Sequence, residues 1–204
     1  EVWFIKIVKL GDISSITTGQ VIKRKEARPG DVDAIQYRIL TLKSFDEDGF
    51  LVKEEIDSFK ASEEIESKYI TSKGDIVVRL SMPFTSITID EESEGILIPS
   101  LFVAIRVNCN DILPSYLSLY LNSNKMKKQY MREARGTAIQ ILKTSAFKEF
   151  EIMLPDMSMQ EQTVTLNELM MREKRLLQLL IKENNKRNQI ILEKMITGGL
   201  NHGD

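Results

Sequence analysis

The sequence predicts an α+β fold: a mixed globular head with a mainly antiparallel sheet, followed by one long coiled-coil-forming helix. Short β-like runs separated by turns fill the first half of the chain, as at 76–80 and 101–107. Beyond Pro155 an apolar stripe at helical spacing continues to about Ile196. We therefore divide the 204 residues into a head at 1–155, a helical arm at 156–197 and a flexible tail at 198–204.

The head elements follow from local patterns. The sequence predicts a short strand at 3–8, a turn at 16–19, a basic loop at 23–28, a β-like run at 37–42, a hairpin turn at 46–49, a short helix or turn at 63–69 and a turn at 73–75. The runs 76–80, 86–89, 96–98 and 101–107 are predicted to be strands of one sheet.

Helical spacing begins after Pro114. Apolar residues predict one helix from Pro114 to Arg135, where Gly136 takes the position after the helix end. An extended segment at 137–142, a short helical piece after Lys143 and a last strand at 152–154 complete the head.

The arm is predicted to begin near Met159, because Ser158 followed by Glu161 has the pattern of a capping box, and to end at Gly198. A helix of about 37 residues is roughly 55 Å long, so its apolar stripe needs a partner beyond the head, most simply the same helix of a second copy. The polar run 182–189 interrupts the stripe and indicates a solvent gap or a docking surface. The predicted dimer seam is Leu169, Leu176, Leu180, Ile190 and Ile191.

Charge is unevenly distributed along the chain. The net charge is −2, but segment 46–94 holds fourteen acids against five bases, whereas segment 122–148 holds seven bases against Glu133 alone. Such a head can offer a basic face to phosphates while its acidic face stays in water. The simpler alternative is a solvated helix face that is rich in lysine.

The residues needed for catalysis are scarce. The sequence has one histidine, His202 in the tail, and one cysteine, Cys109, which together cannot form a zinc site or a catalytic triad. It has no glycine-rich phosphate loop, and Glu66-Ser67-Lys68 matches only half of a nuclease motif. We expect no catalytic residues, no metal and no cofactor. No apolar run approaches the ~18 residues of a membrane span, so we expect a cytoplasmic protein without a membrane partner.

Five groups of residues occur in an order that resembles one family, the DNA-specificity subunits of type I restriction-modification systems. They are Lys9–Ile13 with Thr17–Gly19, Lys73–Arg79, Pro114–Leu117 with Tyr120–Ser123, Gly136–Leu142, and Leu154-Pro155 followed by Gln160 and the long helix. The family's usual subunit carries two target-recognition domains and two such helices. This sequence has one of each and therefore resembles a half subunit.

The resemblance implies a non-catalytic subunit that reads one half of a split site in double-stranded DNA and pairs as a homodimer through the arm. Its implied partners are methyltransferase (modification) subunits and a restriction subunit. Reading DNA requires polar side chains for base edges and cations for phosphates. Candidates in turns and loops are Thr18, Gln20, Lys23, Arg24, Arg28, Arg79, Ser81, Arg135, Thr137, Gln140 and Lys143.

Structural alternatives remain open for some of these residues. Arg79 could form an ion pair with the acidic 46–94 segment, Gly136-Thr137 could be only a helix end and strand start, and Gln140 could be an ordinary exposed strand residue. Two other functions also remain open: the recognition domain of a larger fused methyltransferase-nuclease, and a coiled-coil adaptor that binds only protein. The basic segments at 23–28 and 122–148 argue against the adaptor.

Overall fold

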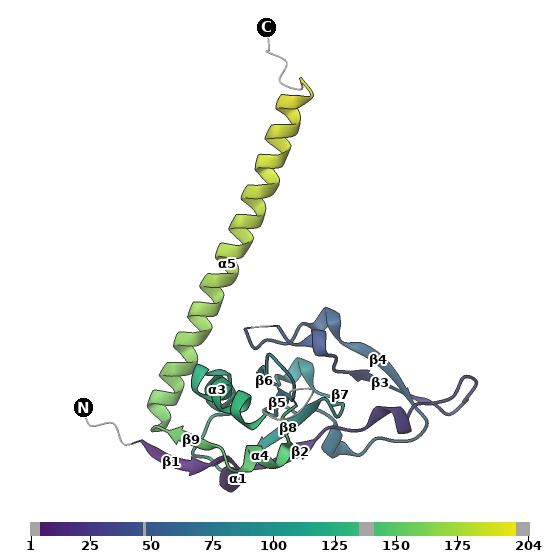
Figure 1. Ribbon diagram of the computed structural model, residues 1–204. Coiled ribbons are helices and arrows are strands. Elements are labelled where there is room, and N and C mark those ends of the chain that lie inside the picture. The colour runs from purple at the N-terminus through teal and green to yellow at the C-terminus, as the bar shows by residue number, and fades with distance from the viewer. Residues whose placement is uncertain (1–4, 47, 135–140, 199–204) are drawn as a thin grey trace. The chain divides into compact units, whose positions relative to one another are not determined.

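The computed structural model describes residues 5–46, 48–134 and 141–198. The chain divides into two compact units, Glu1–Val164 and Thr165–Asp204. Figure 1 shows the elements of both units. The mixed α+β class, the antiparallel sheets and the long C-terminal helix all agree with the sequence prediction.

A four-stranded sheet forms the centre of the first unit. Its strands are β2 (Ser14–Thr18), β8 (Phe102–Val107), β5 (Ile76–Arg79) and β6 (Ser86–Thr88), and all neighbours in that order are antiparallel. β5 and β8 read as almost continuous apolar runs because both of their faces are covered. The predicted turn at 16–19 was wrong in its first part, since Ile16, Thr17 and Thr18 belong to β2 and the chain turns only from Gly19.

A second, three-stranded sheet has the order β4 (Asp57–Ala61), β3 (Ile35–Ile39), β7 (Ile96–Leu97). β3 pairs antiparallel with β4 and parallel with β7. The prediction that 96–98 joins the same sheet as 76–80 was therefore wrong. A short apolar run shows that a strand is buried but carries no information about which strand it pairs with.

The two ends of the head meet in a two-stranded ribbon. β1 (Lys6–Lys9) pairs antiparallel with β9 (Glu151–Leu154). A single helical turn, α1 (Leu10–Ile13), follows β1, and the Leu10 amide donates to the Phe150 carbonyl at 2.9 Å. Residue 47 of the hairpin turn predicted at 46–49 lies outside the described residues. On either side of it the Asp46 amide donates to the Phe50 carbonyl, and Gly49 has φ +87°.

The predicted helix 114–135 is in fact two helices, α2 (Pro114–Asn122) and α3 (Asn124–Glu133). Ser123 lies between them in an extended conformation, and its hydroxyl accepts from the Met126 amide at 3.4 Å. Serine is a good N-cap, so the chain starts a new helix here and changes direction without losing its apolar face. A third short helix, α4 (Thr144–Lys148), precedes β9.

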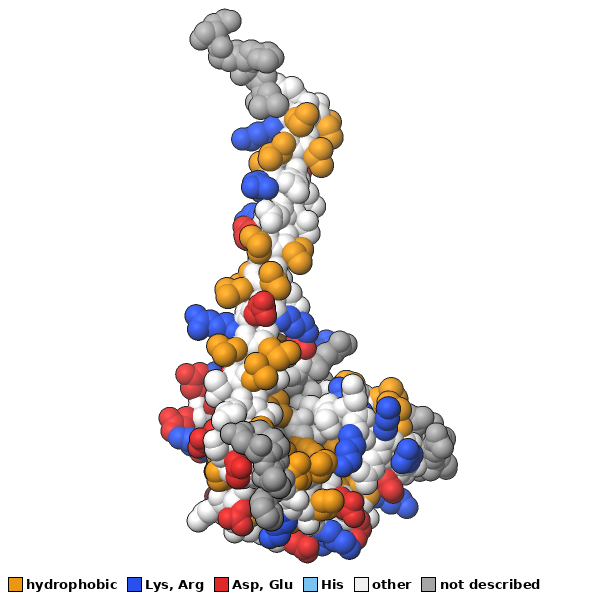
Figure 2. All heavy atoms as spheres, turned by 90° about the vertical axis from the view of Figure 1, so that its left-hand side faces the viewer, with side chains coloured by type: hydrophobic (Ala, Val, Ile, Leu, Met, Phe, Trp, Pro, Cys, Tyr) orange, Lys and Arg blue, Asp and Glu red, His pale blue; other side chains and the backbone are white. Residues whose placement is uncertain are grey.

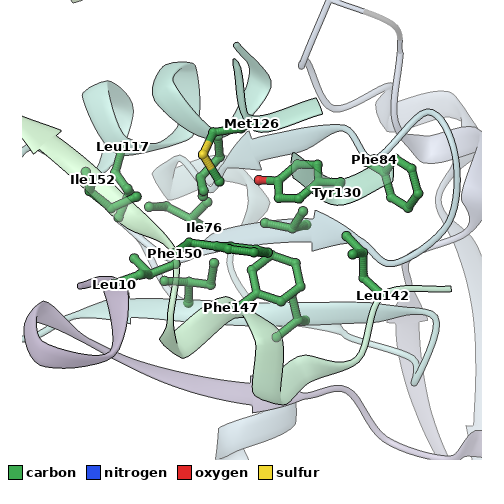
Figure 3. Close-up of a cluster of buried hydrophobic side chains, with 14 of the residues drawn as sticks. Leu10, Ile76, Phe84, Leu117, Met126, Tyr130, Leu142, Phe147, Phe150 and Ile152 are labelled. Atoms are coloured by element: carbon green, nitrogen blue, oxygen red, sulfur yellow. The ribbon is translucent and has the colours of Figure 1, made fainter. Parts of the chain in front are cut away.

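The main core lies between α2, α3 and α4 and one face of the four-stranded sheet. Figure 3 shows Tyr130 of α3 facing a group of aromatic side chains. Its ring centroid lies 5.7 Å from that of Phe84, 5.9 Å from that of Phe147 and 5.4 Å from that of Phe150. Alternate residues of β5 and β8 serve the opposite face, where Phe102 stacks on Phe45 at 4.8 Å. A smaller hydrophobic cluster packs against the three-stranded sheet.

The long helix α5 spans Met157–Ile196. Asp156 caps it, because its carboxylate accepts from the Met159 amide at 2.9 Å, so the capping box predicted at Ser158 was wrong. The first turns of α5 belong to the first unit. There Gln160 is fully buried: its Oε1 accepts from the Leu113 amide at 2.8 Å, and its Nε2 donates to the carbonyls of Asp111 and Pro155.

The helical residues of the second unit leave their apolar side chains in the open. Leu169, Leu176, Leu180, Ile190 and Ile191, the predicted seam, are each between 46% and 58% exposed. Figure 2 shows apolar side chains along the length of this helix. None of the described helices is long and apolar enough to cross a membrane.

Candidate nucleic-acid interface

Five of the predicted DNA-binding residues gather at one end of the four-stranded sheet. Thr18 is the last residue of β2 and pairs with Val103, and Arg79 is the last residue of β5 and pairs with Phe102. Because β8 starts at Phe102, the last residues of β2 and β5 lie at the same end of the sheet. We call this region the polar sheet end and define it by Thr18, Gln20, Arg79, Ser81 and Lys143.

Segment 141–144 is fixed to this edge by hydrogen bonds. The Leu142 amide donates to the Leu80 carbonyl at 2.9 Å, and Ile141 forms a bridge with Ser81. On the other side, the hydroxyls of Thr18 and Thr144 lie 2.6 Å apart. Lys143 stands between these two contacts with an exposed side chain. The ends of β2 and β5 and the start of α4 thus meet in one place.

Gln20 is held beside the same edge by the backbone of 98–100. The backbone N–H of Gln20 donates to the Ile98 carbonyl at 2.8 Å, and the backbone carbonyl of Gln20 accepts from the Ser100 amide at 2.8 Å. The chain can pass this close to residues 98–100 only with glycine at position 19, because a Cβ on Gly19 would lie 2.1 Å from the Pro99 carbonyl oxygen. The family-like Thr-Thr-Gly sequence therefore has a backbone reason: strand β2 must end where the chain passes Pro99.

Arg79 is half-buried at this edge. Its Nε donates to the Ser81 hydroxyl at 3.1 Å, and its Nη1 lies 3.4 Å from the Leu42 carbonyl oxygen. Burial lowers the pKa of Arg79. Arg79 forms no ion pair with a described residue of the acidic 46–94 segment, whereas Arg106 pairs with Asp75 of that segment. The Arg79 charge is thus positioned by neutral groups.

The basic loop lies on a different part of the head. Lys23 and Arg24 belong to a short 3-10 turn at Ile22–Arg24, and the chain after it runs along β4, where the Ala27 amide donates to the Lys60 carbonyl at 2.9 Å. Arg28 is exposed, and its amide donates to the Asp31 carboxylate at 2.7 Å. The structure therefore separates the described candidates into the polar sheet end and this loop, with Gln20 leading from one to the other.

Arg135, Thr137 and Gln140 lie outside the described residues. Of the described candidates, the cations Lys23, Arg24, Arg28, Arg79 and Lys143 take part in no ion pair with another described residue. The acidic segment differs, because Lys53, Lys68 and Lys73 pair there with Glu92, Glu66 and Glu91. The charges of these five candidates are therefore available to an external anion.

Sequence reasoning missed one ion pair that holds the head together. Asp75 is buried at the start of β5, and its carboxylate accepts two hydrogen bonds from Arg106 Nε at 3.0 and 3.1 Å and one from Nη2 at 2.9 Å. Arg106 also donates to the carbonyls of Lys68 and Ile70. The two residues are 31 positions apart, so no local pattern could have joined them. Thr144 was missed for the same reason.

The described residues contain no group of three or more His, Cys, Asp or Glu side chains that could hold a metal ion. The interface is instead made of hydroxyl, amide and cationic groups, which are the groups that contact base edges and phosphates.

Comparisons with known proteins identify the family of the chain. The family described as Type I restriction modification DNA specificity domain matches residues 5–170. A comparison with curated proteins found no match. The chain is similar to the crystal structure of the HsdS subunit from Thermoanaerobacter tengcongensis, with a TM-score of 0.66 and 17% identity over 93% of this chain and 48% of that one.

Two further solved structures are similar. One comes from work on the complex assembly and conformational transition of the type I R-M system. Its TM-score is 0.64, and it has 15% identity over 93% of this chain and 45% of that one. The other is the type I S subunit from M. genitalium, with a TM-score of 0.59 and 14% identity over 96% of this chain and 46% of that one. This chain thus spans about half the length of each. The match over residues 5–170 shows that the chain belongs to the family of type I restriction-modification DNA specificity domains.

Proposed function

We propose that this chain is the sequence-reading subunit of a type I restriction-modification complex, and that its polar sheet end contacts the bases of one half of a split site. The observation that carries the proposal is the family match over residues 5–170, which includes every described residue of the polar sheet end and of the basic loop. A family described as a DNA specificity domain supports a role in recognition and not in catalysis. Methyl transfer and cleavage would then belong to separate modification and restriction subunits.

The chemistry of the interface divides the work between two kinds of contact. Thr18, Gln20 and Ser81 offer hydroxyl and amide groups that donate to and accept from base edges, which distinguishes one base pair from another. Lys143 and the exposed cations of the basic loop offer charge to phosphates, which fixes register without reading sequence. Arg79, fixed by Ser81, would extend a guanidinium toward guanine or toward a phosphate.

We propose further that two copies pair through α5. The chain spans about half of the HsdS and S subunits to which it is similar, so a second copy would supply the other half of a two-headed reader. The exposed apolar stripe gives a physical reason for pairing, since each leucine removed from water contributes on the order of 1.5–3 kcal/mol. The polar run 182–189 within this stripe is proposed as a docking surface for a methyltransferase subunit.

Reconstitution tests the reading function. The full chain is combined with its methyltransferase subunit, and methylated sites are mapped in genomic DNA. We expect an interrupted palindrome, because two identical heads read identical half-sites. A Gln20→Ala or Ser81→Ala variant should relax preference at one base pair in each half, by about 1–3 kcal/mol of discrimination. Methylation without sequence preference would contradict the proposal, and an asymmetric motif would show that the second head is a different chain.

Sedimentation tests the pairing. The wild-type chain alone should be a dimer at micromolar concentration. The double variant Leu176→Asp/Leu180→Asp should be a monomer, because it places two carboxylates in the seam at a cost of several kcal/mol. Glu173→Asp, which keeps the charge of an arm residue, is the control that should remain dimeric. A wild-type monomer would refute pairing of this chain with itself.

A further inference from the structure

One face of α3 carries a row of cations. Lys125, Lys128 and Arg132 are three and seven positions apart, which places them within about 60° of one another around the helix. Their side chains are exposed. Met126 and Tyr130, which are fully buried, lie on nearly the opposite side of the helix. We call these three cations the α3 stripe.

The charges of the α3 stripe are not neutralised within the described part of the chain. Lys125 Nζ donates to the Tyr120 hydroxyl at 3.1 Å and lies 5.7 Å from the centroid of that ring, contacts that fix its position and leave its charge. Neither Lys128 nor Arg132 forms an ion pair with a described residue. Glu133 is the one acid in segment 122–148. The positive charges of the α3 stripe are therefore available to an external anion, whereas those of Lys53, Lys68 and Lys73 are paired with glutamates.

Helix α3 is packed next to the polar sheet end. Figure 3 shows the Tyr130 side chain beside Phe84. Their ring centroids are 5.7 Å apart, and the Phe84 amide donates to the Ser81 carbonyl at 2.9 Å. On α2, the Asn122 side chain bonds to both backbone groups of Ser86, the first residue of β6, at 2.8 Å. The buried face of α3 and the end of α2 thus hold the loop that carries Ser81 on one side, and the α3 stripe lies on the exposed face of α3.

We infer that the α3 stripe binds DNA phosphates that flank the half-site read by the polar sheet end. The inference rests on the proposed function, since it needs a duplex at that edge. Seven residues of helix rise about 10 Å, and one strand of a duplex carries a phosphate about every 3.4 Å along its axis, so the stripe spans roughly three phosphates. Its contribution is sequence-independent: it strengthens binding to every duplex and sets where the polar sheet end meets the bases.

The test is the salt dependence of duplex binding by the full chain reconstituted with its methyltransferase subunit. Each phosphate contact contributes about 0.9 to the slope of log K against log salt. Lys125→Ala/Lys128→Ala/Arg132→Ala should reduce that slope by about 2 to 3, if each cation contacts one phosphate. It should also weaken cognate and unrelated duplexes by the same factor, so that their affinity ratio is unchanged.

The matched control removes the same charge from another place. Lys53→Ala/Lys68→Ala/Lys73→Ala also deletes three cations, but these pair with acids in the free protein. This variant should keep the wild-type slope. Gln20→Ala should lower the cognate-to-unrelated ratio and leave the slope unchanged, which separates base reading from phosphate contact.

Each other outcome overturns the inference. If the α3 variant keeps the wild-type slope while the wild type binds its site, the stripe contacts no phosphate and the proposed function stands. If the control variant loses as much slope, the effect is one of net charge alone. If the α3 variant binds duplex normally but fails to capture the methyltransferase subunit, the stripe is a protein contact. If the wild-type complex binds no duplex, the proposed function fails together with the inference.

Discussion

Apolar side chains are used in opposite ways in the two units of the chain. In Glu1–Val164 the large aromatic residues Tyr130, Phe147 and Phe150 are almost completely buried. In Thr165–Asp204 leucines such as Leu176 and Leu180 are each 58% exposed. The first unit therefore satisfies its own hydrophobic surface, whereas the second one cannot. A helix whose stripe stays exposed gains little from packing within its own chain, which is why we propose that its apolar residues pack against a partner.

The difference also extends to polar groups. Buried polar residues of the first unit find partners far away in the sequence, as Asp75 does with Arg106. The backbone hydrogen bonds of the long helix join residues four positions apart, so they need no partner that is distant in the sequence. The head is therefore expected to fold as a cooperative unit, and the arm to owe its stability to association.

Loss of core packing in the head should have the largest effect. Phe147→Ala removes a fully buried ring that contacts Tyr130 and Phe150, and we expect it to destabilise the head by about 3–5 kcal/mol in urea unfolding. Leu180→Ala is the matched control in the arm. It should leave the unfolding of the head unchanged and affect only the concentration dependence of association. Equal destabilisation by the two changes would remove the distinction between the units.

The buried ion pair should come next. Asp75→Asn leaves Arg106 without its counter-charge, and since the Arg106 side chain is still 27% exposed we expect a loss of about 2–3 kcal/mol. The double variant Asp75→Asn/Arg106→Gln, measured by the same denaturation, should cost less than the sum of the single changes, because the two residues act together. Strict additivity would show that the pair is not coupled and that the loss comes from packing.

The parts of this molecule that sequence predicted are those set by local pattern. The stripe of α5 repeats within one helix, and the apolar runs of β5 and β8 are bounded by turns, so their existence followed from neighbouring residues. The split into two sheets did not, because β7 pairs with β3, whose residues lie more than fifty positions earlier. The division of 114–135 into α2 and α3 had a signal in Ser123, but helical spacing on both sides of it concealed the break.

The interface shows the same division. Thr18 and Arg79 were chosen among polar residues assigned to turns and loops, and the structure brings them to one end of the sheet. That Thr18 meets Thr144, across 126 positions, depends on the order of strands in the sheet and not on any local feature. The α3 stripe was visible only as a basic segment. Its one-sided arrangement required knowing which residues of α3 are buried.

The junction between head and arm offers a smaller effect. Gln160→Ala leaves the Leu113 amide and two carbonyls without their partner inside the head, and we expect a loss of about 1–3 kcal/mol in the unfolding of the head. Gln162→Ala, two residues along the same helix, is the control, because the Gln162 side chain is exposed and, among the described residues, bonds only to Ser158 at 3.3 Å. It should be nearly neutral. A neutral Gln160→Ala would show that water replaces the side chain and that the first turns of α5 are not fixed by it.

The smallest effect is expected at the surface pair of Lys9 and Glu149, which are 2.7 Å apart. The hydrogen bond from Lys9, and then its charge, lower the pKa of Glu149 below its usual value of 4.5. A lowered pKa in the folded state means that the pair stabilises the head above pH 4.5 and that this stabilisation is lost as the pH falls through the lowered value.

Glu149→Gln should therefore lower the melting temperature slightly at pH 7, and the difference from wild type should vanish toward pH 2. Because the two side chains are 55% and 70% exposed, the difference should also shrink in high salt. Glu151→Gln, which removes a neighbouring charge that makes no hydrogen bond to Lys9, is the control and should show a smaller pH-dependent difference. A difference that persists at pH 2 would mean that Glu149 acts through packing and not through its charge.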